Sequence, residues 1–131
     1  MKQMNFVVSH QRKVQVEDKA TGRKFWVPEK VVDQSGIGFV DGNKVYIART
    51  FKKTVDGTVV EKTAIDEIEL ERITPCFDKT RKLQPNTYTG EFTKTFEITK
   101  ALHPELPSDE YKEASAHTEV TVTYTVWYKI I

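Results

Sequence analysis

The side chains best suited to catalysis or metal binding in this 131-residue chain are three histidines and one cysteine. His10, His103 and His117 lie far apart in sequence, and they form neither a helical pair nor a His-x-His pair on a strand. Cys76 could act as a nucleophile only with a distant histidine. We therefore expect surface imidazoles and an inert, partly buried thiol. We expect no catalytic residue, no metal or other cofactor, and no enzyme activity.

Motifs for phosphate and cation binding are also missing from the sequence. No GxxxxGK[ST], GxGxxG or GxSxG pattern occurs, and Gly36-Ile37-Gly38 is only a fragment of one. Glu67, Glu69 and Glu71 would share one face of a strand and could there bind a divalent cation. Because no carboxylate-rich loop lies beside them, we expect a solvated edge instead.

Basic and aromatic side chains on two predicted strands are suited to single-stranded nucleic acid. Bases stack on aromatic rings, at about 1–3 kcal/mol each, while cations follow the phosphates. The alternative is that Phe25 and Phe51 belong to the core and that the lysines are ordinary solubilising charges. The predicted nucleic-acid-binding residues are Lys24, Trp26, Tyr46, Arg49, Phe51, Lys52 and Lys53.

The last strand offers a possible protein interface. Residues 120–130 alternate strictly, with one apolar row and a second row that contains Thr121, Thr123, Thr125 and Trp127. At a sheet edge, the free N–H and C=O groups of this strand would accept a partner strand or a second copy. Alternatively the strand is central, and its threonine row packs under an irregular or helical insert at residues 100–116.

A third candidate is a protruding β-ribbon at residues 49–62. Asp56-Gly57 predicts a type I′ turn, which places Val55 opposite Thr58 and Lys52 opposite Glu61. Four cations against two carboxylates give the ribbon a charge of +2. It could enter a nucleic-acid groove or hook a neighbouring subunit, and the alternative is a hairpin without a partner.

The elements that must position these groups are strands. The chain contains 16 Thr, 15 Val and 8 Ile against 4 Leu and 6 Ala, a balance that favours a pleated sheet. We expect a single mainly β domain over residues 1–131, a small antiparallel barrel or sandwich of about seven or eight strands. One or two short helices are expected, one of them at residues 108–116 after the predicted N-cap Ser108.

Several segments between these elements have their own predicted structure. Residues 64–73 fit a strand better than a helix, and Pro28 should end a strand or lie at an edge. Residues 35–38 are expected to form a flexible connector. Residues 74–85 are expected to form a basic loop.

Charge and composition limit the class of protein and the compartment in which we expect it. A net charge of +1 excludes both a strongly basic protein that coats duplex DNA and an acidic DNA mimic. One cysteine permits no intramolecular disulfide, which fits a reducing compartment. The N-terminus lacks the apolar run of a signal peptide, and no stretch approaches the ~20 apolar residues of a membrane span. We expect a soluble, cytoplasmic protein without a membrane partner.

One short segment resembles a known group of proteins. Trp26-Val27-Pro28-Glu29-Lys30 is similar to the W-[IV]-P-x-[KS] segment that follows a hairpin in small bacteriophage-encoded β-rich proteins, mostly of unassigned function. The usual Ser-Gln continuation is replaced here by Val31-Val32. The resemblance implies a viral origin, with the host cytoplasm as the location, and transfers no catalytic residue.

Two functions from different classes follow from these features. The first is a non-enzymatic module that binds single-stranded nucleic acid through a basic and aromatic sheet face. The second is a protein-binding factor of phage type, either an inhibitor of a host or defence enzyme or a virion assembly component. Such a factor would act through an edge strand or the ribbon tip, and it could act as a homo-oligomer.

Overall fold

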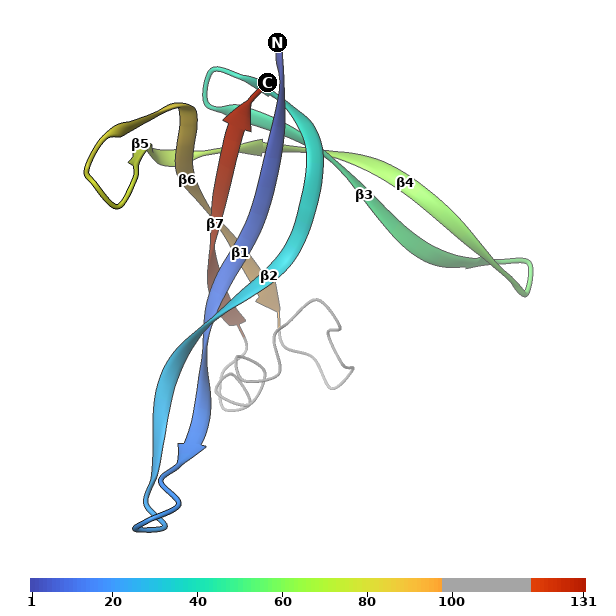
Figure 1. The fold of residues 1–131 in the computed structure, drawn as a ribbon. Coiled ribbons are helices and arrows are strands. Elements are labelled where there is room, and N and C mark those ends of the chain that lie inside the picture. The colour runs from blue at the N-terminus through green and yellow to red at the C-terminus, as the bar shows by residue number, and fades with distance from the viewer. Residues whose placement is uncertain (98–118) are drawn as a thin grey trace.

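The computed structural model describes residues 1–97 and 119–131 and shows one open, curled sheet (Figure 1). The order across the sheet is β4-β3-β2-β1-β7-β6-β5, and all pairings are antiparallel. The outer strands β4 and β5 are not paired with each other, so the sheet forms a half-barrel. The strands are β1 (Lys2–Glu17), β2 (Lys24–Asp41), β3 (Lys44–Val55), β4 (Thr58–Glu69), β5 (Glu71–Phe77), β6 (Leu83–Glu97) and β7 (Glu119–Ile130).

The predicted fold class is confirmed in its main feature. Strands hold 84% of the described residues, as the excess of Thr, Val and Ile indicated. The sheet is neither closed into a barrel nor folded into a two-sheet sandwich. The described residues contain no helix, and the helix expected at residues 108–116 lies outside them, as does the whole insert at 100–116.

The inner face of the curled sheet carries the core. Alternate residues of β1 and β7 form its centre, and β7 confirms the strand predicted at residues 120–130. Because a single sheet has no second layer to cover it, the curl brings the inner faces of distant strands together. The buried hydrophobic residues are Met4, Phe6, Val8, Val40, Val45, Ile47, Leu70, Phe96, Val122, Tyr124, Val126 and Tyr128.

Several sequence predictions for the connecting segments need correction. Residues 35–38 are not a connector but lie within β2. Most of the predicted basic loop at 74–85 is strand, because β5 reaches Phe77 and β6 begins at Leu83. The strand predicted at 64–73 is confirmed, although buried Leu70 divides it into β4 and β5.

A long hairpin, here called the β1/β2 arm (residues 11–30), extends from the sheet (Figure 1). β7 pairs with β1 only as far as His10, and β3 pairs with β2 only at Phe39–Asp41, so the arm pairs only with itself among the described residues. Asp18 N–H donates to Arg23 O at 2.8 Å. Hydrogen-bonded and non-hydrogen-bonded pairs alternate along the hairpin from this bond. The nitrogen of Pro28 therefore faces away from β1, on the side of β2 where no N–H is required. Pro28 thus lies at an edge, as predicted.

A second hairpin, here called the β3/β4 arm (residues 49–64), also extends away from the sheet (Figure 1). Asp56 and Gly57 have φ values of 50° and 76°, which are the positive angles of a type I′ turn. The predicted pairs are confirmed, with Val55 opposite Thr58 and Lys52 opposite Glu61.

The junction between β2 and β3 depends on a glycine. These strands pair over only three rungs, and a Cβ added at Gly38 would lie 2.5 Å from the backbone oxygen of Tyr46. The same Cβ would meet the side chains of Met4 and Phe6. Only glycine therefore lets β3 approach β2 this closely.

We expect Gly38→Ala to destabilise the fold by about 3 kcal/mol, the upper end of what overpacking typically costs, because a backbone oxygen cannot move aside. The control is Gly22→Ala, where the new Cβ has no neighbour within 4 Å but the φ of +70° is strained. That change should cost about 1 kcal/mol. Urea unfolding of both variants measures the difference, and equal losses would contradict the tight junction.

Candidate binding surfaces

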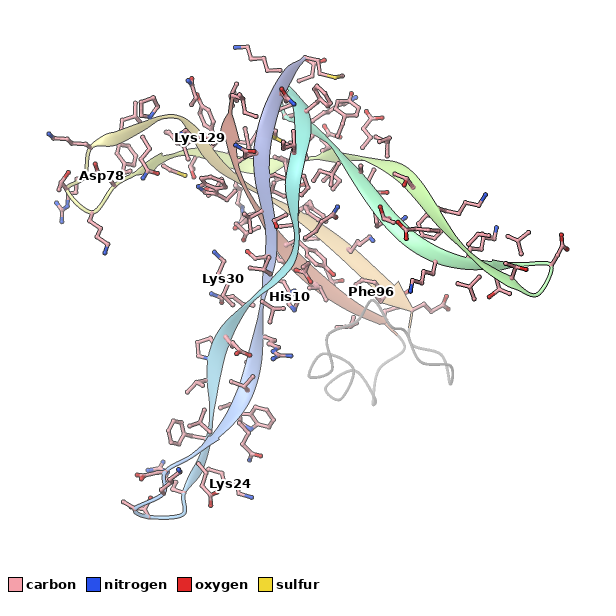
Figure 2. The ribbon with its side chains drawn as sticks, turned by 45° about the vertical axis from the view of Figure 1, so that its right-hand side comes forward. His10, Lys24, Lys30, Asp78, Phe96 and Lys129 are labelled. Atoms are coloured by element: carbon pink, nitrogen blue, oxygen red, sulfur yellow. The ribbon has the colours of Figure 1, made fainter. Side chains whose placement is uncertain are left out.

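A polar pair of buried His10 and partly exposed Asp33 lies where the β1/β2 arm leaves the sheet, and His10 is labelled in Figure 2. The register shift between Val8 and Ser9 buries three consecutive residues, Val8, Ser9 and His10, instead of alternate ones. His10 Nδ1 lies 2.7 Å from Asp33 Oδ2. Because an ionised carboxylate can only accept, Nδ1 donates the hydrogen in this bond.

The surroundings of His10 are apolar on the side away from Asp33. The imidazole meets the Tyr124 ring edge to face, with centroids 5.7 Å apart. Nε2 is buried and has no hydrogen-bond partner among the described residues. The pair links β1 to β2 at the base of the arm.

An open trough of about 970 Å³ lies beside this pair, between the base of the β3/β4 arm and strands β6 and β7. Its polar lining is mostly paired internally, since Arg49 Nε donates to Asp66 Oδ2 at 2.9 Å. The guanidinium of Arg49 also lies 5.1 Å from the centre of the Phe51 ring. The trough is lined by, among others, Asp33, Arg49, Asp66, Phe92, Lys94 and Tyr124.

The predicted nucleic-acid-binding residues do not form one surface. Lys24 and Trp26 lie on the β1/β2 arm, with Lys24 near its tip (Figure 2), whereas the other five lie on β3. The ladder also splits those five between two faces. Arg49, Phe51 and Lys53 share the inner face, and Tyr46 and Lys52 share the outer one.

Of the two positions that the sequence left open for the last strand, the structure has the central one and not the edge. β7 lies between β1 and β6, so a partner strand cannot add along it where both neighbours are present. The row of Thr121, Thr123, Thr125 and Trp127 instead lies on the outer face, where Thr121 and Thr95 are hydrogen-bonded at 3.0 Å. Periodicity assigned these residues to one face but could not identify the neighbours of the strand.

The candidate chemical residues are dispersed. No group of three or more His, Cys, Asp or Glu side chains could hold a metal ion within residues 1–97 and 119–131. Glu67 is engaged by Lys44 at 3.2 Å, and this hydrogen bond raises the pKa of Lys44. Cys76 is half-buried within β5 and not in a loop, while His103 and His117 lie outside the described residues.

The outer face carries an apolar cluster that the sequence analysis missed. Ile37 and Phe39 on β2 are 58% and 45% exposed, and Phe39 lies directly opposite Tyr46 on β3. Val7 and Trp127 form a second pair on the same face. We call these five residues the outer patch. In the sequence, this cluster is indicated by the alternation of Ile37 and Phe39. The glycines on either side of Ile37 instead suggested a connector at residues 35–38.

Comparison with known proteins found no match among protein-family models, curated proteins or solved structures. In the described part of the chain, no helix is both long and apolar enough to cross a membrane. Function is therefore argued from the geometry of the surfaces described above.

We expect Asp33→Ala to destabilise the protein by about 1–3 kcal/mol, because it leaves the buried Nδ1–H of His10 without its acceptor. Glu29→Ala is the matched control, since it removes the partly exposed ion pair with Arg12 on the neighbouring part of the arm. That loss should stay below about 1 kcal/mol. Chemical denaturation measures both, and an Asp33 effect no larger than the control would argue against the pair as an anchor.

Proposed function

We propose that this chain is a non-enzymatic module that binds other polypeptides through its outer patch and arms. The observation that carries the proposal is the outer patch itself, where Ile37 and Phe39 are 58% and 45% exposed on a sheet that no other described element covers. Contiguous exposed apolar groups of this kind mark protein interaction sites, and aromatic residues are enriched in such interfaces. The near-neutral charge of +1 fits a protein partner better than a polyanion.

The arms support the same proposal. An isolated two-stranded hairpin is marginally stable in water, so long arms gain stability when a partner covers them. The β1/β2 arm places Val16 and Phe25 opposite each other on one face, and both are exposed. The resemblance of residues 26–30 to bacteriophage proteins favours, within this proposal, a virion component or an inhibitor of a host enzyme, acting in the host cytoplasm.

We expect a double variant, Ile37→Lys with Phe39→Lys, to lose most of the polypeptide that copurifies with the tagged wild-type protein. Both positions face solvent, so the fold should persist, as circular dichroism can check. The control, Thr93→Lys with Thr95→Lys, adds the same two charges to the outer face on β6, away from the patch. Mass spectrometry and the absorbance ratio at 260 and 280 nm identify what is bound. Recovery of nucleic acid with no polypeptide would contradict the proposal.

Nucleic-acid binding by the β1/β2 arm is the second candidate, because one face of the arm combines Trp26 with Lys24 and Lys30. Trp26 is 59% exposed, which leaves its ring open to stacking. A two-stranded antiparallel ribbon also fits the major groove of duplex DNA. This candidate uses a single arm, unlike the sheet face expected from the sequence.

If the arm binds single-stranded nucleic acid, Trp26→Ala should weaken binding of a labelled oligonucleotide by the ~1–3 kcal/mol of one stacked base. Phe77→Ala is the matched control, since Phe77 is equally exposed on β5. Fluorescence anisotropy over a salt series measures both. Equal effects of the two variants, or an affinity insensitive to salt, would exclude this candidate.

A further inference from the structure

Strand β4 is an edge strand along its whole length. It pairs with β3 over twelve consecutive rungs, from Lys44 opposite Glu69 to Val55 opposite Thr58, without a register shift. It is the last strand in the sheet order, and no described strand pairs with its other side. Its open side therefore presents a regular row of backbone groups.

The ladder identifies the residues in this row. The two-residue turn at Asp56-Gly57 makes Val55 and Thr58 a hydrogen-bonded rung. Because rungs alternate along an antiparallel pair, every second residue of β4 directs its N–H and C=O away from β3. The residues of this free edge are Val59, Glu61, Thr63, Ile65, Glu67 and Glu69.

Two other open edges carry features that hinder strand addition. β5 contains Pro75, two register shifts and a positive φ at Arg72. The open side of β2 in the β1/β2 arm is interrupted by Pro28. β4 has no proline, glycine or bulge, and its free edge exposes 63% of Val59 and 66% of Ile65. Long, regular and partly apolar edges are the ones that accept another strand.

We propose that β4 pairs antiparallel with β4 of a second copy of this chain, with Thr63 on the two-fold axis. The inference rests on the proposed function, namely that the chain works by binding polypeptides, and it names one partner and one site. A two-fold axis makes the contact isologous, so the same residues serve both copies. In this register Val59 faces Glu67 of the second copy, and Glu61 faces its Ile65.

Charge disfavours the neighbouring symmetric registers. An axis at Lys62 would oppose two lysines, an axis at Ala64 would oppose Glu61 and Glu67, and an axis at Ile65 would oppose Glu61 and Glu69. With the axis at Thr63, no like charges face each other directly, and the strands overlap along their whole length. Lys62 then lies diagonal to Asp66 of the second copy on one side and to its Lys62 on the other.

Ion pairs within each copy reduce the remaining repulsion. β4 carries four carboxylates and one lysine. Asp66 is bonded to Arg49 at 2.9 Å, and Glu67 to Lys44 at 3.2 Å. Half of the carboxylates that would approach the second copy are thus already neutralised from the β3 side.

The first test compares proline at two ends of one rung. Thr63 and Thr50 lie opposite each other, and both direct their N–H away from the β3–β4 ladder. Thr63→Pro removes a donor from the free edge of β4, whereas Thr50→Pro removes one from the opposite side of the same arm. By light scattering on the full chain, we expect dimers for wild type and Thr50→Pro, and a monomer of 15.1 kDa for Thr63→Pro. A dimeric Thr63→Pro protein would overturn the proposal.

The second test is a cross-link. Cα atoms on a hydrogen-bonded rung are ~5.5 Å apart, which a disulfide can span. In a Cys76→Ser background, Thr63→Cys should form covalent dimers on mild oxidation, and Thr50→Cys should not. Absence of the Thr63 cross-link overturns this pairing even if a dimer exists. If the wild type is a monomer but still binds another polypeptide through the outer patch, the β4 pairing is contradicted and the proposed function is not.

Discussion

The structure depends on one constraint, which is that a single sheet must bury its own apolar face. There is no second layer among the described residues, so the inner faces of β1, β3 and β7 bury one another by curling. The close approach at Gly38 and the register shift after Val8 are the local features that permit this curl. The core is small, because each strand contributes only the few residues that reach the inside of the curl.

A self-covering sheet has two consequences for function. Within residues 1–97 and 119–131 no element covers its outer face, where Ile37, Phe39 and Tyr46 are at least partly exposed. Its strands are also longer than the sheet they share, and the excess length forms arms that pair only with themselves. Both features expose surface, and exposed apolar surface together with open backbone groups is what polypeptide partners recognise.

The polar pairs of the molecule are consistent with this interpretation. His10 and Asp33 are bonded to each other at the base of an arm, and Arg49 and Asp66 are bonded at the base of the other. Each pair links two strands at the point where an arm leaves the sheet, and so helps to hold the extended strands in place.

The sequence alone determined which segments are strands, because β-branched residues and alternation are local properties. It also determined the turn at Asp56-Gly57 and the pairs that flank it, since a two-residue turn fixes register. At residues 35–38 the glycines led to a wrong prediction of a flexible connector. Gly38 is required there because β3 lies so close to β2 that no side chain fits between them.

Only the tertiary structure decided which strands are neighbours. Alternation tells which face a residue occupies but not which strand lies beside it, so it could not distinguish a central β7 from an edge strand. For the same reason Lys24 and Trp26 were grouped with Arg49 and Phe51, although the arms that carry them separate beyond three shared rungs. Strand order is set by long-range burial on the inner face, and that burial exists only once the sheet has curled.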